Sequence, residues 1–149
     1  NVHGYIVGEH GDTQLPLWSA THIAGMNVEE YGNKHNNIFN IQEKELIKED
    51  VKQAGAIIIK NKGATYYAIA VAVNSLVETL VRNQNTIRTV SSVIDGYYGI
   101  SDVAISLPAL INSNGVEKII EFPITQEEEK LLKASADTIK SMLDALKDI

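Results

Sequence analysis

Cysteine is missing from this sequence of 149 residues. Its absence excludes a disulfide framework and a thiolate metal site, and it fits a reducing compartment such as the cytoplasm. Basic residues are also scarce, because 13 lysines and arginines stand against 19 acidic residues and leave a net charge of −6. That balance, with no basic stripe along the chain, argues against nucleic acid as a partner.

Long apolar runs are missing as well. The longest, residues 68–73, is far shorter than the roughly 20 residues that a bilayer-spanning helix needs. The chain begins with Asn1 rather than methionine, and no charged start with an apolar core follows it. We therefore expect no signal peptide, no membrane partner, a cytoplasmic location, and a chain that is part of a longer protein.

Several catalytic motifs are absent too. The sequence has neither Gly-x-Gly-x-x-Gly nor a Walker loop, and neither Gly-x-Ser-x-Gly nor His-Glu-x-x-His. These absences disfavour a phosphate cradle, a serine hydrolase and a zinc protease. His3, His10 and Glu9 do not suggest a metal site either, because residues 3 and 10 of one strand would face opposite sides. We expect no metal.

What is present has the size of one ordinary domain. We expect a strand over residues 1–7 and a short helix over 15–24, with Pro16 early in it, where its missing N–H costs little. Ser19 would then lie in an amphipathic helix. Glycine and polar residues punctuate 25–37, which has the weakest pattern.

Two helices are predicted in the middle of the chain. Apolar residues at i, i+4, i+7 and i+11 from Ile47 form one stripe and predict a helix over residues 42–61. The next helix, over residues 64–82, is apolar on every side in its first half. That pattern predicts a central, buried helix.

The last third reads as hairpins followed by a helix. Strands are expected at 87–94 and from Val103 to Leu107, and Asn114-Gly115 is a hairpin signal. Thr125 and Glu128 have the spacing of a capping box. A long terminal helix would follow, with its buried face at Leu132, Ala136, Ile139, Leu143 and Leu146. This order predicts an α+β fold, a mostly antiparallel sheet of hairpins with long helices.

One stretch near the start carries candidate chemistry. Residues 7–13 read Val-Gly-Glu-His-Gly-Asp-Thr, so two glycines and two carboxylates surround His10. A strand ending in a sharp turn would present this histidine on a loop held by a scaffold, where an imidazole can exchange a proton near neutral pH. A turn histidine bonded only to its surroundings remains the alternative. Neither Glu9 nor Asp12 is assured as its orienting carboxylate.

A second candidate is Thr65, which we expect to open the buried helix. It is either an ordinary first-turn hydroxyl or a ligand contact at a helix N-terminus, where backbone N–H groups favour an anion such as a carboxylate. The sequence leaves both readings open.

With these two segments in view, the chain resembles one enzyme family along essentially its whole length. The part around His10 looks like the active-site segment of L-lactate dehydrogenases, and the part around Thr65 resembles their second substrate-contacting segment. Other stretches resemble the later strands of the family. The matching stretches are residues 2–13 with 16–19, 62–70, 95–99, and 107–111 with 114–116.

This resemblance implies a fold and a set of roles. Residues 1–149 would be the C-terminal substrate-binding domain, and the NAD-binding Rossmann domain is not in this chain. His10 would exchange a proton with the C2 oxygen of pyruvate or lactate while NAD exchanges a hydride with C2. Thr65 would contact the substrate and Ile69 the nicotinamide. His3 would belong to the fructose 1,6-bisphosphate site of bacterial allosteric members, which are homotetramers.

The chain also departs from the family pattern. The orienting aspartate, the arginine that clamps the substrate carboxylate, and the mobile-loop residues all belong to the part that precedes this stretch in the family. Ala20 follows Ser19 where many members have a histidine, and His22 comes two residues later, which leaves effector control open. A malate or other 2-hydroxyacid dehydrogenase domain is the near alternative, although Gly-Ala-Thr around Thr65 is more lactate-like. An isolated assembly module is the other.

Overall fold

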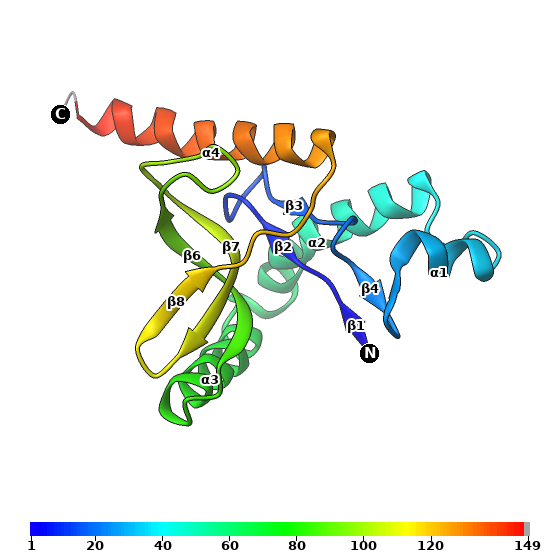
Figure 1. Cartoon of the computed structure of the whole chain (residues 1–149), viewed down its shortest axis with the longest axis horizontal. Coiled ribbons are helices and arrows are strands. Elements are labelled where there is room, and N and C mark those ends of the chain that lie inside the picture. Colours follow the sequence, from blue (N-terminus) through cyan, green and yellow to red (C-terminus); the bar gives the residue numbers. More distant parts are fainter. Residues whose placement is uncertain (148–149) are drawn as a thin grey trace.

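A three-stranded antiparallel sheet lies at the centre of the structure, a computed structural model that describes residues 1–147 (Figure 1). Its strands are β6 (Thr86–Ile94), β7 (Val103–Asn112) and β8 (Gly115–Ile119), in the order β6-β7-β8. β7 is the central strand and is buried along most of its length. The expected strands and the hairpin near Asn114-Gly115 are therefore confirmed, with Gly115 at a φ of +96° that suits glycine.

Helix α4 (Gln126–Leu146) lies across this sheet (Figure 1). Leu132 and Ala136 are buried in the core, as the helical stripe predicted. The predicted capping box is present, because Thr125 and Glu128 each bond the other's backbone N–H. The second half of the stripe is different: Leu143 and Leu146 are exposed, because the helix extends past the layer it packs against.

The first 27 residues form short strands instead of the expected long strand and helix. β1 (Val2–His3) and β2 (Ile6–Val7) belong to different sheets, so the single strand over 1–7 is wrong. β2 pairs with β3 (Leu15–Pro16), and β4 (His22–Ile23) pairs with β1 and β5 (Met26–Asn27).

The helix expected over 15–24 is also wrong, and Ser19 lies in a turn. Leu15, Pro16 and Leu17 are all buried, and the N–H of Leu17 donates to the carbonyl of Tyr5 at 2.9 Å. Ala24 and Gly25, both at positive φ, close the β4–β5 hairpin. Pairing with residues 1–7 thus overrides local helical spacing.

The polar stretch after residue 25 is more regular than expected. Helix α1 (Val28–Lys34) begins after Asn27, whose side chain accepts the N–H of Glu29 at 2.9 Å. This N-cap supplies the start signal that the weak apolar pattern did not reveal. The predicted helix over 42–61 is confirmed as α2 (Ile41–Lys62), although none of its residues is buried.

Helix α3 (Tyr67–Val81) contradicts the expectation of a buried central helix. It packs on β7 along one side (Figure 1), but its only buried residue is Thr79, and Val71 and Val81 are exposed at 70% and 79%. Apart from the side on β7, most of this helix is exposed within residues 1–147. The apolar pattern therefore marks a surface that the described part of the chain leaves uncovered.

No helix within residues 1–147 combines the length and apolarity required to cross a membrane.

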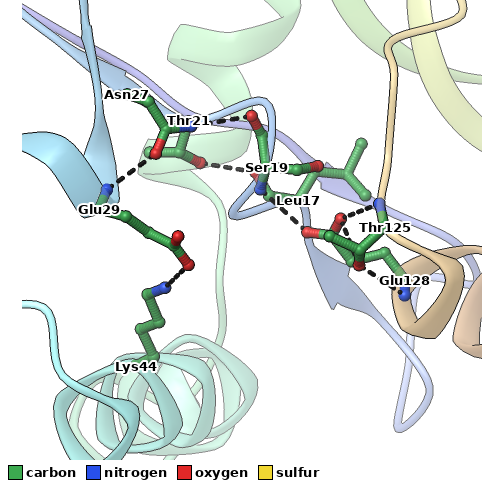
Figure 2. A network of polar contacts seen from close by, with 8 residues as sticks. All are labelled: Leu17, Ser19, Thr21, Asn27, Glu29, Lys44, Thr125 and Glu128. Atoms are coloured by element: carbon green, nitrogen blue, oxygen red, sulfur yellow. Dashed lines mark hydrogen bonds and ion pairs between the residues drawn. The ribbon is translucent and has the colours of Figure 1, made fainter.

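One buried carboxylate joins α4 to the turn at Ser19 (Figure 2). Glu128, exposed at only 8%, accepts the backbone N–H of Ser19 at 3.0 Å and that of Thr125 at 2.9 Å. Burial raises the pKa of the Glu128 carboxyl, but these bonds and that of the Thr125 hydroxyl outweigh it and hold the pKa below its usual value. Asn27 then donates to the carbonyl of Ser19 at 3.0 Å, so the network continues to α1.

We expect Glu128→Gln to lower the free energy of unfolding by about 2 kcal/mol at pH 7, the usual scale for a hydrogen-bonded charge. A carboxyl with a lowered folded-state pKa stabilises fully above its ordinary value of 4.5 and loses that contribution as pH falls through the lowered value. The difference in unfolding free energy between Glu128→Gln and the wild type, measured by urea denaturation, should therefore become smaller in acid. Exposed Glu127, in the same helical turn, is the matched control as Glu127→Gln. A gap that is constant with pH would contradict the assignment.

Candidate functional site

His10 lies in a turn that follows β2 directly. Gly8 forms a bridge with β7: its N–H donates to the carbonyl of Ser106 at 3.0 Å, and the N–H of Ser106 donates back at 3.1 Å. Two residues later the chain leaves the sheet, and His10 is exposed. The predicted presentation of this histidine, on a turn at the end of a strand, is the arrangement in the structure.

The two glycines of the turn differ in how much they are constrained. Gly8 has a φ of +94°, and a Cβ added there would lie 2.7 Å from Ser135 Oγ. Gly11 has an ordinary φ, but a Cβ there would collide with the Glu9 carboxylate. Glycine at position 8 therefore provides both the positive φ and the close packing, whereas at position 11 the one obstacle is the end of a flexible side chain that can move.

Both carboxylates beside His10 are bonded elsewhere. Glu9 accepts the N–H of Thr13 at 3.1 Å and also its hydroxyl. Asp12 forms an ion pair with Lys52 of α2 at 3.1 Å, a surface contact worth little stability. Within residues 1–147 no hydrogen bond joins either carboxylate to the His10 ring. The orienting carboxylate that an acid–base histidine needs is therefore neither of these.

Sequence reasoning missed the residue that holds this turn from the other side. Ser135 of α4 is fully buried, accepts the N–H of Glu9 at 2.8 Å, and lies 3.0 Å from the Thr13 hydroxyl. The partners are 126 and 122 residues apart in sequence. A serine within a helical stripe carries no signal for such a contact, so only the packing of α4 reveals it.

Thr65 lies in the link between two helices, so the expectation of a first-turn residue is wrong. Gly63, at a φ of +81°, ends α2, and α3 begins only at Tyr67. The Tyr66 side chain caps no N–H. Thr65 is exposed, and Ile69, in the first turns of α3, is 61% exposed. Within residues 1–147 no hydrogen bond joins these side chains to His10.

His3 is exposed on β1 and lies opposite His22 of β4 in the strand register. The His22 ring bonds through Nδ1 to the carbonyl of Ala20 at 3.0 Å. Directly opposed residues of an antiparallel pair share one face, so the two imidazoles lie on the same side of this small sheet. In the described part of the chain no three histidine or carboxylate side chains gather closely enough to hold a metal ion.

The predicted site residues face open surface. A cavity of about 600 Å³ lies between β3, α2 and α4, and Trp18, Lys44 and Glu128 are in its wall. His10, Thr65 and Ile69 are not part of that wall. Proton transfer to a bound substrate requires water to be excluded, and these three exposed side chains lack such a cover within residues 1–147.

Comparison with known proteins places these features in a family. Residues 1–149 match the lactate/malate dehydrogenase, alpha/beta C-terminal domain. L-lactate dehydrogenase of Acetivibrio thermocellus is 46% identical over 98% of this chain and 46% of its own length. L-lactate dehydrogenase 1 of Clostridium acetobutylicum is 47% identical over 98% of this chain and 47% of its own length.

Solved structures agree with these relatives. The L-lactate dehydrogenase from Clostridium thermocellum superposes with a TM-score of 0.85 and 60% identity, over 99% of this chain and 47% of that chain. The minor L-lactate dehydrogenase from Enterococcus mundtii, in its ligands-bound form, has a TM-score of 0.91 at 33% identity, over 97% of this chain and 46% of that chain. The chain thus spans about half the length of the proteins it matches.

The packing of Gly8 can be tested by substitution. Gly8→Ala imposes both a positive φ on alanine and a contact with Ser135, whereas Gly25→Ala, at a φ of +84° with open space around it, imposes only the first. We expect Gly25→Ala to cost about 1–2 kcal/mol of unfolding free energy and Gly8→Ala about 1–3 kcal/mol more. Urea denaturation of both variants measures the difference, and equal losses would contradict close packing at Gly8.

Proposed function

Because this chain belongs to the lactate/malate dehydrogenase family, as its α/β C-terminal domain, we propose that it supplies the acid–base half of an NAD-dependent L-lactate dehydrogenase. The reaction is (S)-lactate + NAD⁺ = pyruvate + NADH + H⁺. Residues 1–149 would form the substrate-binding domain, and a separate Rossmann domain of the full-length protein would bind most of NAD. The names of the relatives and their twofold greater length support this division.

The observation that carries the proposal is the placement of His10. Its ring is exposed on a turn whose two ends are anchored to β7 and α4. An imidazole held in this way can donate a proton to the C2 oxygen of pyruvate and take it back from lactate. The nicotinamide cofactor, when bound, would supply the redox chemistry, because NAD⁺ accepts a hydride from lactate and NADH donates one to pyruvate. A mobile histidine would lose the alignment that such a transfer needs.

Thr65 and Ile69 fit the remaining roles by their chemistry. The exposed Thr65 hydroxyl precedes the start of α3, where no side chain caps the first N–H groups; a substrate carboxylate suits such a place. The exposed, apolar Ile69 suits contact with a nicotinamide ring. In this proposal the chain contacts the cofactor through Ile69, and it has no glycine-rich loop to bind the phosphates.

We place the carboxylate clamp outside this chain. The sequence contains two arginines, Arg82 and Arg88. Arg82 pairs with Glu78 at 3.0 Å, and Arg88 donates to the Ser75 hydroxyl at 2.9 Å. Both guanidinium groups thus have partners within this chain, and neither is bonded to the His10 turn in the part that the structure describes. This supports a site completed by the other half of the protein.

The same proposal includes an assembly and an effector. We assign the full-length protein to a homotetramer, with exposed apolar side chains of α3 among the surfaces that become covered. His3, opposite His22, would contribute to a fructose 1,6-bisphosphate site. The proposal takes pyruvate and lactate as the substrate pair and the cytoplasm as the location.

Substitution of the histidine tests the reaction directly. In the full-length protein, His10→Ala should lower pyruvate reduction by about 10²–10⁴-fold, because a general acid–base group contributes that much. The absorbance of NADH follows the rate. His35→Ala, at an exposed histidine that stacks on Tyr31 with ring centroids 4.3 Å apart, is the matched control and should retain activity. A fall of less than tenfold in the rate of pyruvate reduction by His10→Ala would contradict the role of His10 as the acid–base residue.

The division of labour between domains gives another test. The 149-residue chain alone should not reduce pyruvate with NADH, because it holds neither the carboxylate clamp nor the main cofactor site. Measurable turnover by the isolated chain would refute the division of catalysis between two domains.

Oxaloacetate in place of pyruvate, with the full-length protein, separates a malate dehydrogenase from a lactate dehydrogenase. A preference of the full-length protein for oxaloacetate would refute pyruvate as its substrate.

A further inference from the structure

A closed set of hydrogen bonds surrounds the His10 turn. It starts at the N–H of Glu9, passes through the Ser135 hydroxyl at 2.8 Å to the Thr13 hydroxyl at 3.0 Å, and returns to the Glu9 carboxylate. The N–H of Thr13 bonds the same carboxylate at 3.1 Å. The residues on either side of His10-Gly11-Asp12 are therefore fastened to each other and to α4.

The direction of each bond follows from the chemistry of its ends. A backbone N–H can only donate, so Ser135 Oγ accepts from Glu9. The ionised Glu9 carboxylate can only accept, so the Thr13 hydroxyl donates to it and must in turn accept from Ser135. Each hydroxyl proton in the ring thus has one acceptor: Ser135 donates to Thr13, and Thr13 donates to Glu9. The ring is complete only when both hydroxyls are present.

Ser135 differs from the other hydroxyl residues of its helix. Thr138 and Ser141 bond the carbonyls four residues back, at 3.1 and 2.8 Å, which is the usual local bond of a helical hydroxyl. The Ser135 hydroxyl is fully buried and bonds out of the helix. The close approach of Gly8, where a Cβ would lie 2.7 Å from Ser135 Oγ, leaves room for this contact.

We propose that Ser135 is a positioning residue for His10. Its hydroxyl closes the ring that holds the backbone on both sides of the histidine, and it keeps the Glu9 carboxylate on Thr13 rather than on the imidazole. Ser135 touches no reacting atom, and it acts through the turn. The role rests on the proposed function, in which His10 transfers the proton.

The first test is Ser135→Ala in the full-length protein. We expect kcat for pyruvate reduction to fall about tenfold to a hundredfold, since a small misplacement of a catalytic group has effects of that size. KM for pyruvate should stay within about twofold of wild type, because Thr65 and the carboxylate clamp are untouched. The deuterium isotope effect with NADH labelled at the transferred position should rise as the chemical step becomes slower. Ser141→Ala, on the exposed part of α4, is the matched control and should leave all three unchanged.

A second measurement does not depend on activity. Hydrogen–deuterium exchange of the peptide containing Glu9 should become faster in Ser135→Ala, because its N–H loses a buried acceptor. If Ser135→Ala does not fold, Thr13→Val tests the same ring, because it removes the other hydroxyl. Thr13→Ser keeps a hydroxyl at that position. We expect Thr13→Val to reproduce the loss in kcat and Thr13→Ser to recover most of it.

The outcomes separate the two proposals. Faster exchange at Glu9 with an unchanged kcat would overturn the positioning role while the proposed function stands. A fall in kcat that only follows the loss of folded protein, with no change in isotope effect, would overturn it as well. If the wild-type protein does not reduce pyruvate, the proposed function fails and the role for Ser135 fails with it, whatever the exchange rate shows.

Discussion

The backbone bridge between Gly8 and Ser106 is the contact on which the arrangement of the candidate site depends. β7 is the central strand of the sheet and is buried beneath α4, so a segment bonded to it inherits a fixed position. Gly8 reaches β7 because it has no side chain to occupy the space that Ser135 fills. Everything that follows in the turn, including His10, is placed relative to this bridge.

Two buried polar side chains join distant parts of the chain. Ser135 fastens the turn to the middle of α4, and Glu128 fastens the turn at Ser19 to the start of the same helix (Figure 2). Both are buried, and a buried polar group is costly unless it is bonded. These two contacts therefore specify one docking of α4 over the first 20 residues, whereas apolar packing at Leu132 and Ala136 alone would tolerate small shifts.

The exposed apolar surface of α3 and the incomplete site have a common explanation in the proposed function. Val71, Val81 and Ile69 are all largely exposed, and a folded protein rarely leaves such a surface uncovered. Within residues 1–147, His10 likewise has no hydrogen-bonded carboxylate and is exposed. A chain that spans about half the length of its relatives would gain an orienting carboxylate and a cover from the other half and from neighbouring subunits.

Local patterns in the sequence determined much of this molecule. The spacing of Thr125 and Glu128 predicted a capping box, alternation predicted β7, and the glycines around His10 predicted its turn, because each of these signals acts within a few residues. Tertiary structure alone decided the rest. Residues 15–16 and 22–23 became short strands because residues 1–7 offered partners. Most of α3 stayed exposed because nothing within residues 1–147 covers it. Ser135 became the anchor of the His10 turn through a contact across 126 residues, a separation at which periodicity and spacing carry no information.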